Sequence, residues 1–477
     1  MDQPKRQHPL WMIFLSVQHI KNVIFPLVAI VFINGSSIKS VIIYGGGFLL
    51  IFTIYAVVSA IFEWKNFTYY VKDNNLEISD GRFISKKRYI TLNKIQSIQE
   101  DKTLLHRIFG LASLTIVTGT SGDNSIVQLN VITPEDSEEI KALLHAQKPS
   151  TPEAIVEKEH SLDTETKHHY SMSIKEIILI SITSLYFLAF IPVALTGYFK
   201  LDDLFEIDTY TVSIVNAIKA SYILIAVLIL SVFLISFIFG LITTYLKYGK
   251  YKVTSNHERI FISKGVISTS QFSIQKNKVH GIIIKKPFFR RLFGIVEVQI
   301  ITLGDLFDDM DSETDILFPF ININLARELT EELLPEYEIK KDMTRVPAKS
   351  LFLNLIKPSY LLVIITVITF YFWPEFWFIP VIYLMLIISA RVVGHYNNCY
   401  LIRENMIQLQ TGAFSSELTI IKKENIDLLS VNESWLERKF DVATLSTITR
   451  AKPVHVANVN HLPKNIATET YQWYAKK

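Results

Sequence analysis

The chain has 477 residues, of which 49% are hydrophobic and only 19% are charged, and its mean hydropathy is +0.29. Three soluble domains alone would not be this apolar, so part of the chain is expected to lie in a lipid bilayer. The net charge of +3 is too small to indicate a nucleic-acid-binding protein. The single cysteine, Cys399, excludes an internal disulfide and a cysteine-based metal cluster.

The N-terminal region, residues 1–62, is expected to form a membrane hairpin after a basic opening. Its second apolar run, residues 41–62, is long enough to cross a bilayer as a helix. The first run, residues 11–33, is interrupted by Gln18, His19 and Lys21. An interfacial position with these side chains among the headgroups explains the interruption, and a functional buried Lys21 is the alternative. The run has no small-residue cleavage site, so no cleaved signal peptide is expected.

Residues 63–147 are expected to form a first soluble module. Its β-rich runs precede a helix that begins near Thr133 and Pro134, with acidic residues in the first turn. Residues 148–172 then combine early prolines, mixed charges and no apolar period, which predicts a flexible linker. Its adjacent His168 and His169 would point in different directions on a helix, so they make a poor metal site.

The second membrane hairpin is predicted over residues 173–247, and the second module over residues 248–340. In this module Val296, Val298 and Ile300 alternate with polar residues, as a half-buried strand requires. The apolar run before Phe199 contains Pro192, which neighbouring helices can tolerate in a membrane.

An acidic loop from Asp305 to Asp315 resembles a calcium-binding loop only superficially. Thr314 stands where an EF-hand needs glycine, and Phe320 stands where the bidentate glutamate belongs. A solvated loop between two strands is therefore the expected structure.

The third unit has the same order. Residues 341–395 contain a basic linker and a hairpin whose apolar runs are joined by Pro374 and Glu375. Residues 396–477 follow as a third module, which is expected to be divergent. Its last segment offers only Ile466 and Trp473 as obvious core residues for a helix.

An internal repeat links the three modules. Each copy has a glycine, and 29 residues later a position that is preceded by phenylalanine, with arginine two residues before that phenylalanine. The third copy has aspartate in place of the second glycine. The copies are Gly81 with Arg107, Phe109 and Gly110; Gly265 with Arg291, Phe293 and Gly294; and Gly412 with Arg438, Phe440 and Asp441.

The predicted fold class is therefore six membrane helices in three hairpins, plus three α+β modules with several strands and a C-terminal helix. Six spans place both termini and all modules on one side of a plasma membrane. The positive-inside rule favours the cytoplasm, because the basic residues near span ends lie on the module side. They are Lys5, Arg6, Lys65, Lys247, Lys250, Arg391 and Arg403.

No catalytic constellation and no cofactor site is apparent in the sequence. Basic and aromatic residues instead gather around the repeat. Cations beside aromatic side chains suit an anionic membrane surface or a partner protein. The alternative is that the repeated phenylalanine packs in a core and the charges form a solvated face. The candidate lipid or partner contacts are Lys285, Lys286, Arg290, Arg291, Lys86, Lys87 and Arg88.

The threefold order of hairpin and module, with the repeated arginine and phenylalanine and the opening from Pro4 to Pro9, resembles the bacterial pleckstrin-homology-like membrane proteins of three-module type. The resemblance implies a β-sandwich or part-barrel closed by one helix, used for binding and not for catalysis. It also implies a role in cell-envelope stress or antimicrobial resistance, often beside a smaller one-module sibling.

Three functional hypotheses follow. The first is a non-enzymatic membrane scaffold, whose modules bind one another in a homo-oligomer or bind a membrane-protein partner such as the one-module sibling. The second is a protein that binds anionic lipid. The third is a transporter, for which Gln18, His19, Lys21 and Pro192 are the few polar or helix-breaking residues in the spans.

Overall fold

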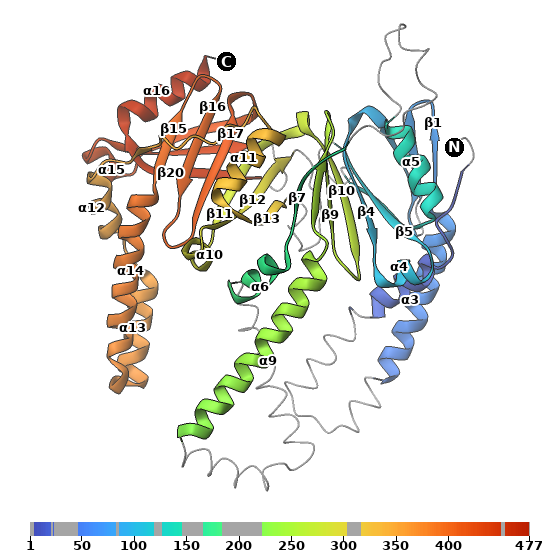
Figure 1. Ribbon diagram of the computed structural model, residues 1–477, viewed down its shortest axis with the longest axis horizontal. Helices are drawn as coiled ribbons and strands as arrows, with labels where there is room; N and C mark the ends of the chain where they lie inside the picture. The colour runs from blue at the N-terminus through green and yellow to red at the C-terminus, as the bar shows by residue number, and fades with distance from the viewer. Residues whose placement is uncertain are drawn as a thin grey trace. The chain divides into compact units, whose positions relative to one another are not determined.

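The computed structural model describes residues 4–20, 22, 46–82, 85–118, 126–145, 166–183, 222–302, 316–449 and 454–476, and Figure 1 colours them along the chain. Contacts divide the chain into two compact units. The first comprises residues 1–254 and 261–273, and the second comprises residues 255–260 and 274–477. Lys21, Pro192 and the acidic loop from Asp305 to Asp315 lie outside the described residues.

The first unit contains one three-stranded sheet, in the order β1-β2-β3, and one seven-stranded sheet, in the order β6-β5-β4-β10-β9-β8-β7. A helix at Trp11–Ile20 precedes them. The elements are α3 Gly46–Asn66, β1 Thr68–Lys72, β2 Asn75–Asp80, β3 Lys86–Thr91, β4 Ile95–Lys102, α4 Leu104–Ile108, β5 Ala112–Thr118, β6 Ile126–Ile132, α5 Pro134–His145, β7 Lys167–Ser171, α6 Ile174–Thr183, α9 Tyr222–Tyr248, β8 Lys252–Ser255, β9 Arg259–Lys264 and β10 Thr269–Gln275.

The second unit contains a seven-stranded sheet, in the order β13-β12-β11-β17-β16-β15-β14, and a three-stranded sheet, in the order β18-β19-β20. Its elements are β11 Val279–Lys286, α10 Phe288–Leu292, β12 Ile295–Thr302, β13 Ile316–Asn322, α11 Ile323–Leu333, β14 Thr344–Arg345, α12 Lys349–Ile356, α13 Tyr360–Phe372, α14 Phe378–Asn397, β15 Cys399–Ile402, β16 Met406–Thr411, β17 Ser416–Lys422, β18 Ile426–Asn432, α15 Trp435–Lys439, β19 Val442–Thr449, β20 Val456–Pro463 and α16 Lys464–Ala475.

Each seven-stranded sheet is shared by two successive repeats. In the first, β4 to β6 of the first repeat pair with β8 to β10 of the second through β4 and β10. In the second, β11 of the second repeat pairs antiparallel with β17 of the third (Figure 1). In this pair Ile282 lies opposite Ile420. The repeats are thus joined edge to edge, although the sequence suggests separate modules.

Two hydrophobic cores lie at the ends of the chain. The first includes Trp11, Tyr69 and Ile140, so the N-terminal helix and α5 pack against β1 to β6. The second includes Leu429, Leu445 and Ala467, which join β18, β19 and α16. The third module therefore has a complete set of six strands and a closing helix, and its helix is better formed than its sequence suggests. Ala467 is buried there, and the partly buried Ile466 and Trp473 pack beside it.

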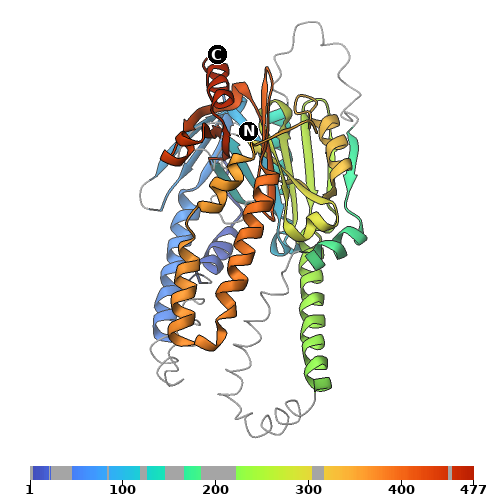
Figure 2. The ribbon, with the colours of Figure 1, turned by 90° about the vertical axis from the view of Figure 1, so that its left-hand side faces the viewer.

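Two helical stretches in the described part of the chain, residues 349–372 and 374–397, are long and apolar enough to cross a membrane. They form an antiparallel hairpin of α13 and α14, with a short turn at Pro374–Phe376 (Figure 2). Helix α3 has 21 residues and α9 has 27. The other halves of these two hairpins lie partly or wholly outside the described residues, so six membrane helices remain a prediction.

The linker prediction is wrong at its end. Residues 167–171 form strand β7 at the edge of the first shared sheet, and Tyr170 is buried there. His168 and His169 therefore lie on an edge strand. By contrast, the predicted alternation in the second module is confirmed, since Val296, Val298 and Ile300 are buried on β12 while Glu297 and Gln299 are not.

Candidate functional site at the repeat hairpins

The repeat glycines adopt backbone angles that other residues avoid. Gly265 has φ of 98° and Gly412 has φ of 119°, and each lies in the turn between the second and third strands of its module. A Cβ atom on either would collide with a carbonyl oxygen three residues later. Asp441 adopts φ of 53°, where Gly110 and Gly294 have 65° and 66°. The repeat thus records backbone conformation, which aspartate also tolerates.

These turns, which we call the repeat hairpins, hold the ends of the long apolar helices. Asn66 at the end of α3 donates to the carbonyls of Gly81 (3.2 Å) and Arg82 (2.8 Å). Asn397 at the end of α14 donates in the same way to Gly412 (3.2 Å) and Ala413 (2.6 Å). Both asparagines precede the repeat glycine by 15 residues, a signal that the sequence contained.

Backbone hydrogen bonds join the hairpin at Gly265 to the end of α9. The amide of Gly265 donates to the carbonyl of Gly249 (2.8 Å), and the amide of Val266 donates to that of Leu246 (3.2 Å) at the end of α9. Every repeat hairpin therefore lies at the end of one apolar helix. If these helices span a bilayer, the hairpins lie at its surface.

The one-turn helices α4, α10 and α15, which we call the mark helices, contain the repeated arginine. Arg107 on α4 donates to the carbonyls of Val266 (2.7 Å) and Ile267 (3.2 Å) in the next repeat hairpin. On α10, Phe288 packs edge-on against Phe414 of the hairpin that follows Gly412, with ring centroids 5.5 Å apart. A mark helix thus docks on the repeat hairpin of the next module.

One residue at the same place in each mark helix attaches it to its own sheet. His106 hydrogen-bonds the carbonyl of Asn130 (2.8 Å) from its Nε2. Arg290 forms an ion pair with Glu297 (2.9 Å) and lies 4.0 Å from the centre of the Phe320 ring. A partly buried arginine that is engaged in this way makes a structural contact, so Arg290 is the least suitable of the candidate lipid contacts.

The third helix is attached by Glu437, which accepts from the Thr444 hydroxyl (2.7 Å) and lies 3.6 Å from the Nε2 of His461. Burial alone would raise the pKa of Glu437, but hydrogen bonds from the backbone and side chain of Ser434 and from Thr444 lower it overall. Burial lowers the pKa of His461 to about 4, so this imidazole is neutral at pH 7.

The repeated phenylalanine is not a core residue in the first two copies. Phe109 is 53% exposed and Phe293 is 52% exposed. Other apolar residues of the same two helices are exposed as well, so each presents an apolar cluster beside a repeat arginine. The exposed residues are Leu104, Leu105, Ile108, Phe288, Phe289 and Leu292.

The remaining predicted basic residues are spread over two strands. Lys285 and Lys286 end β11, where Lys285 lies opposite Glu417 and burial lowers the pKa of Lys286. Lys86 and Lys87 begin β3 and are exposed, whereas Arg88 forms an ion pair with Asp80. Three of the seven predicted residues thus belong to the first unit and four to the second.

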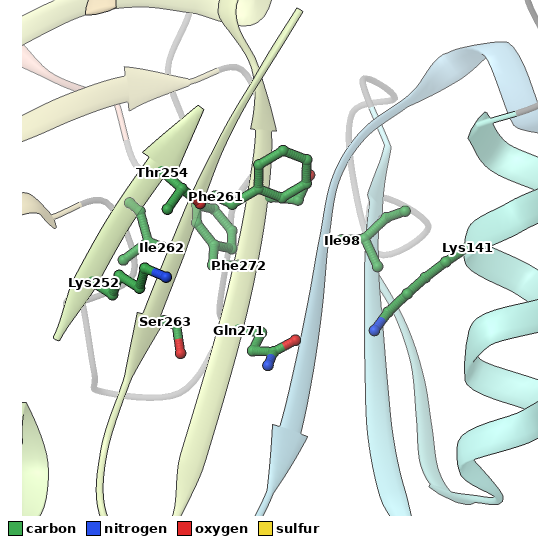
Figure 3. Close-up of a pocket in the computed structure, with 10 residues that line it drawn as sticks. Ile98, Lys141, Lys252, Thr254, Phe261, Ile262, Ser263, Gln271 and Phe272 are labelled. Atoms are coloured by element: carbon green, nitrogen blue, oxygen red, sulfur yellow. The ribbon is translucent and has the colours of Figure 1, made fainter. Parts of the chain in front are cut away.

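A cavity of about 350 Å³ lies on the first shared sheet. Figure 3 shows Lys141 of α5 and Ile98 of β4 on one side and the side chains of β8 to β10 on the other. Lys141 forms an ion pair with Glu100, and burial lowers its pKa. On the second shared sheet, Gln408 of β16 stands where Phe261 stands on the first, four residues before the repeat glycine, and donates to the carbonyl of Glu338 (2.8 Å). The chain itself thus covers the equivalent face there.

Comparison with known proteins agrees with this repeated architecture. The family model described as Bacterial PH domain matches residues 23–148, 189–337 and 353–477. The transmembrane protein YdbT of Bacillus subtilis (strain 168) is 26% identical over 490 residues, which covers 100% of this chain and 99% of that protein. No solved structure matches. The chain therefore belongs to the bacterial PH domain family, with three matches to its model, and it is similar along its whole length to a transmembrane protein.

Proposed function

We propose that the protein is a non-enzymatic membrane scaffold, whose modules face the cytoplasm and bind partner proteins in the response to cell-envelope stress. The observation that supports binding is that the repeats already join through strand edges, as in β11 and β17. Main-chain pairing at an edge is a common way for one polypeptide to bind another. The stress role rests on the family resemblance alone.

The test is to cross-link the protein in cells, purify it in a mild detergent and identify what co-purifies by mass spectrometry. We expect a membrane protein, or a second copy of this chain, in stoichiometric amount. A chain carrying the same tag but lacking residues 396–477 is the matched control, because it loses the third module. Recovery of the full chain with enriched anionic lipid and no protein would overturn the scaffold.

A second candidate function is shallow binding to anionic lipid by the mark helices. It is favoured by the exposed apolar cluster on α10. In this cluster Leu292 and Phe293 directly follow the repeat arginine, Arg291, in the sequence. Apolar side chains next to cations suit the headgroup region of a bilayer. Both α10 and the end of α14 contact the repeat hairpin at Gly412, which places this cluster near an apolar helix.

This second function predicts that Arg291→Glu together with Leu292→Asp lowers binding of the detergent-solubilised full chain to vesicles containing anionic lipid. Each lost cation near the surface accounts for about 1 kcal/mol. Arg290→Gln is the contrasting variant, because it breaks the ion pair with Glu297 and should reduce stability instead. Unchanged vesicle binding by the double variant would eliminate lipid recognition at α10.

A further inference from the structure

The strand pairing of the three repeats follows one rule, and two of the described strands lack the partner that this rule predicts. The third strand of each later module pairs with the fourth strand of the module before it, β10 with β4 and β17 with β11. The first strands are covered by preceding segments, since Lys5 pairs with Tyr69 of β1, β7 with β8, and β14 with β15. In the part of the chain that the structure describes, β3 and β18 are the strands that the rule leaves without a partner.

Side chains along these two edges are exposed where their counterparts are buried. Tyr89 on β3 is 63% exposed, whereas Ile420, eight residues after its own repeat glycine as Tyr89 is, is fully buried. On β18, Leu428 is exposed and Val431 is partly exposed. The shared strand β11 is buried on both faces over Ile282–Ile284. An edge strand with exposed large apolar residues is a template for pairing with another chain.

The mark helix α15, which follows β18 in the chain, also has exposed side chains at the positions where the other mark helices make contacts. Trp435 on α15 occupies the place of Phe288, which packs against Phe414 of the following hairpin, yet Trp435 is 77% exposed. Arg438 occupies the place of Arg107, which bonds two hairpin carbonyls, and its side chain is largely exposed. The repeat hairpins at Gly265 and Gly412 receive α4 and α10, so neither of these contacts involves α15.

We propose that β18 and α15 of one copy bind β3 and the repeat hairpin at Gly81 of a second copy of this chain. The register of β11 with β17 fixes the expected pairs, with Leu429 opposite Tyr89 and Asn432 opposite Lys86. Tyr89 then lies opposite Leu429 as Ile420 lies opposite Ile282, and its side chain, exposed in the single chain, becomes covered. Trp435 and Arg438 contact the hairpin.

This arrangement rests on the scaffold function and specifies one of its partners. Because the two surfaces differ, the contact is head to tail, and it produces a ring or an open row of copies in the membrane. The occupant is a second copy because the complementary edge, with its repeat glycine and hairpin, is present in the same sequence. Each new contact repeats pairing that the chain already makes twice.

The test uses two full-length copies with different tags, both with Cys399→Ala, expressed together in the same membranes. One carries Asn432→Cys and the other carries Lys86→Cys. Opposed residues in an antiparallel pair have Cα atoms about 4.5–5.5 Å apart, which permits a disulfide. We expect a cross-linked species with both tags after oxidation. Lys72→Cys, an exposed position on β1, is the matched control and should give none.

A second variant separates loss of binding from loss of folding. Tyr89→Asp removes a side chain that is exposed in the single chain, so the chain should fold normally while co-purification of the two tagged copies falls by about tenfold or more. Tyr471→Asp, at another exposed tyrosine, should leave it unchanged. Absence of the two-tag species, or a disulfide that forms only when both cysteines are in one chain, overturns the proposal. A different protein recovered in stoichiometric amount would overturn it while leaving the scaffold intact.

Discussion

Asp441 replaces the second glycine of the repeat in the third copy, but it keeps the backbone conformation of that glycine. Its φ of 53° lies in the left-handed region, and its carbonyl accepts from the amide of Lys464 (3.1 Å). Gly294 makes the same contact with Ile323 (3.1 Å). The repeat spacing therefore predicts the position of this left-handed residue correctly. The aspartate suggests that the third copy diverges, but its backbone conformation matches that of the two glycines.

We predict that Asp441→Gly raises the free energy of unfolding, and that Asp441→Ala lowers it. A left-handed conformation costs a non-glycine residue about 1–2 kcal/mol, less for aspartate, so a gain of about 0.5–1 kcal/mol is expected for glycine. Thermal unfolding of the full chain in detergent provides the measurement. Gly412→Ala is the contrasting variant, because its Cβ meets the carbonyl of Ser415. An equal response to glycine and alanine at 441 would contradict the argument.

Arg290 illustrates what a residue type hides. In the sequence it is one of a row of cations, and a cation is most often a surface residue. The structure places its guanidinium between Glu297 and the Phe320 ring, which lie on different strands. The contact depends on tertiary packing, so local composition could not have separated Arg290 from the exposed Arg291.

At the scale of elements, α15 is held to β19 and β20 by a buried acid and a neutral imidazole. His461 lies 3.6 Å from Glu437, and Lys357 also acts on it electrostatically. Since the pKa of His461 is lowered to about 4 in the folded chain, the unfolded chain binds a proton at higher pH than the folded chain does.

The unfolding free energy should therefore decrease as the pH falls from about 6.5 towards 4, by up to about 3 kcal/mol from this residue. Glu437, whose pKa is lowered, adds a further loss only at more acidic pH. His461→Asn should make thermal stability less dependent on pH between 7 and 4.5, because asparagine does not titrate and tolerates the positive φ of 63°. An unchanged pH profile in this variant would assign the acid sensitivity elsewhere.

Strand positions were largely readable from the sequence, whereas strand partners were not. The alternation on β12 predicts one buried face, and the structure confirms it. The run Ile282–Ile284 is buried on both faces of β11, which is typical of a strand inside a sheet. Its partner, β17, lies more than a hundred residues away beyond two apolar helices. No pattern within either strand identifies the other as its partner, so the sequence does not predict the shared sheets.

At the scale of the whole molecule, long apolar helices and modules alternate along the chain. Each repeat hairpin is attached to the end of an apolar helix, and each shared sheet continues one module into the next. The family match and the membrane character follow from sequence order and composition. The number of membrane spans is harder to predict, because polar residues interrupt some apolar runs, such as residues 11–33. Composition alone does not show whether such a run crosses the bilayer.

The hairpin of α13 and α14 contains the residues from which we infer the orientation of the chain in the membrane. Its turn contains Trp373 and Trp377, both exposed, with Glu375 between them. Tryptophan prefers the membrane interface. At the other end, next to the third module, Lys349 begins α12, and Arg391 donates to the carbonyl of Leu355 (2.8 Å). Charges of this sign favour the cytoplasmic side.

We predict that a fluorescent reporter fused after residue 477 is active and that alkaline phosphatase fused at the same place is not, since the latter requires export. Phosphatase inserted at Glu375 should show the opposite result, because that turn would lie outside. Exchanging Lys349, Lys357 and Arg391 for glutamine should weaken this preference without adding apolar length. Active phosphatase after residue 477 would place the third module outside the cell, and its open strand β18 could then meet only extracellular partners.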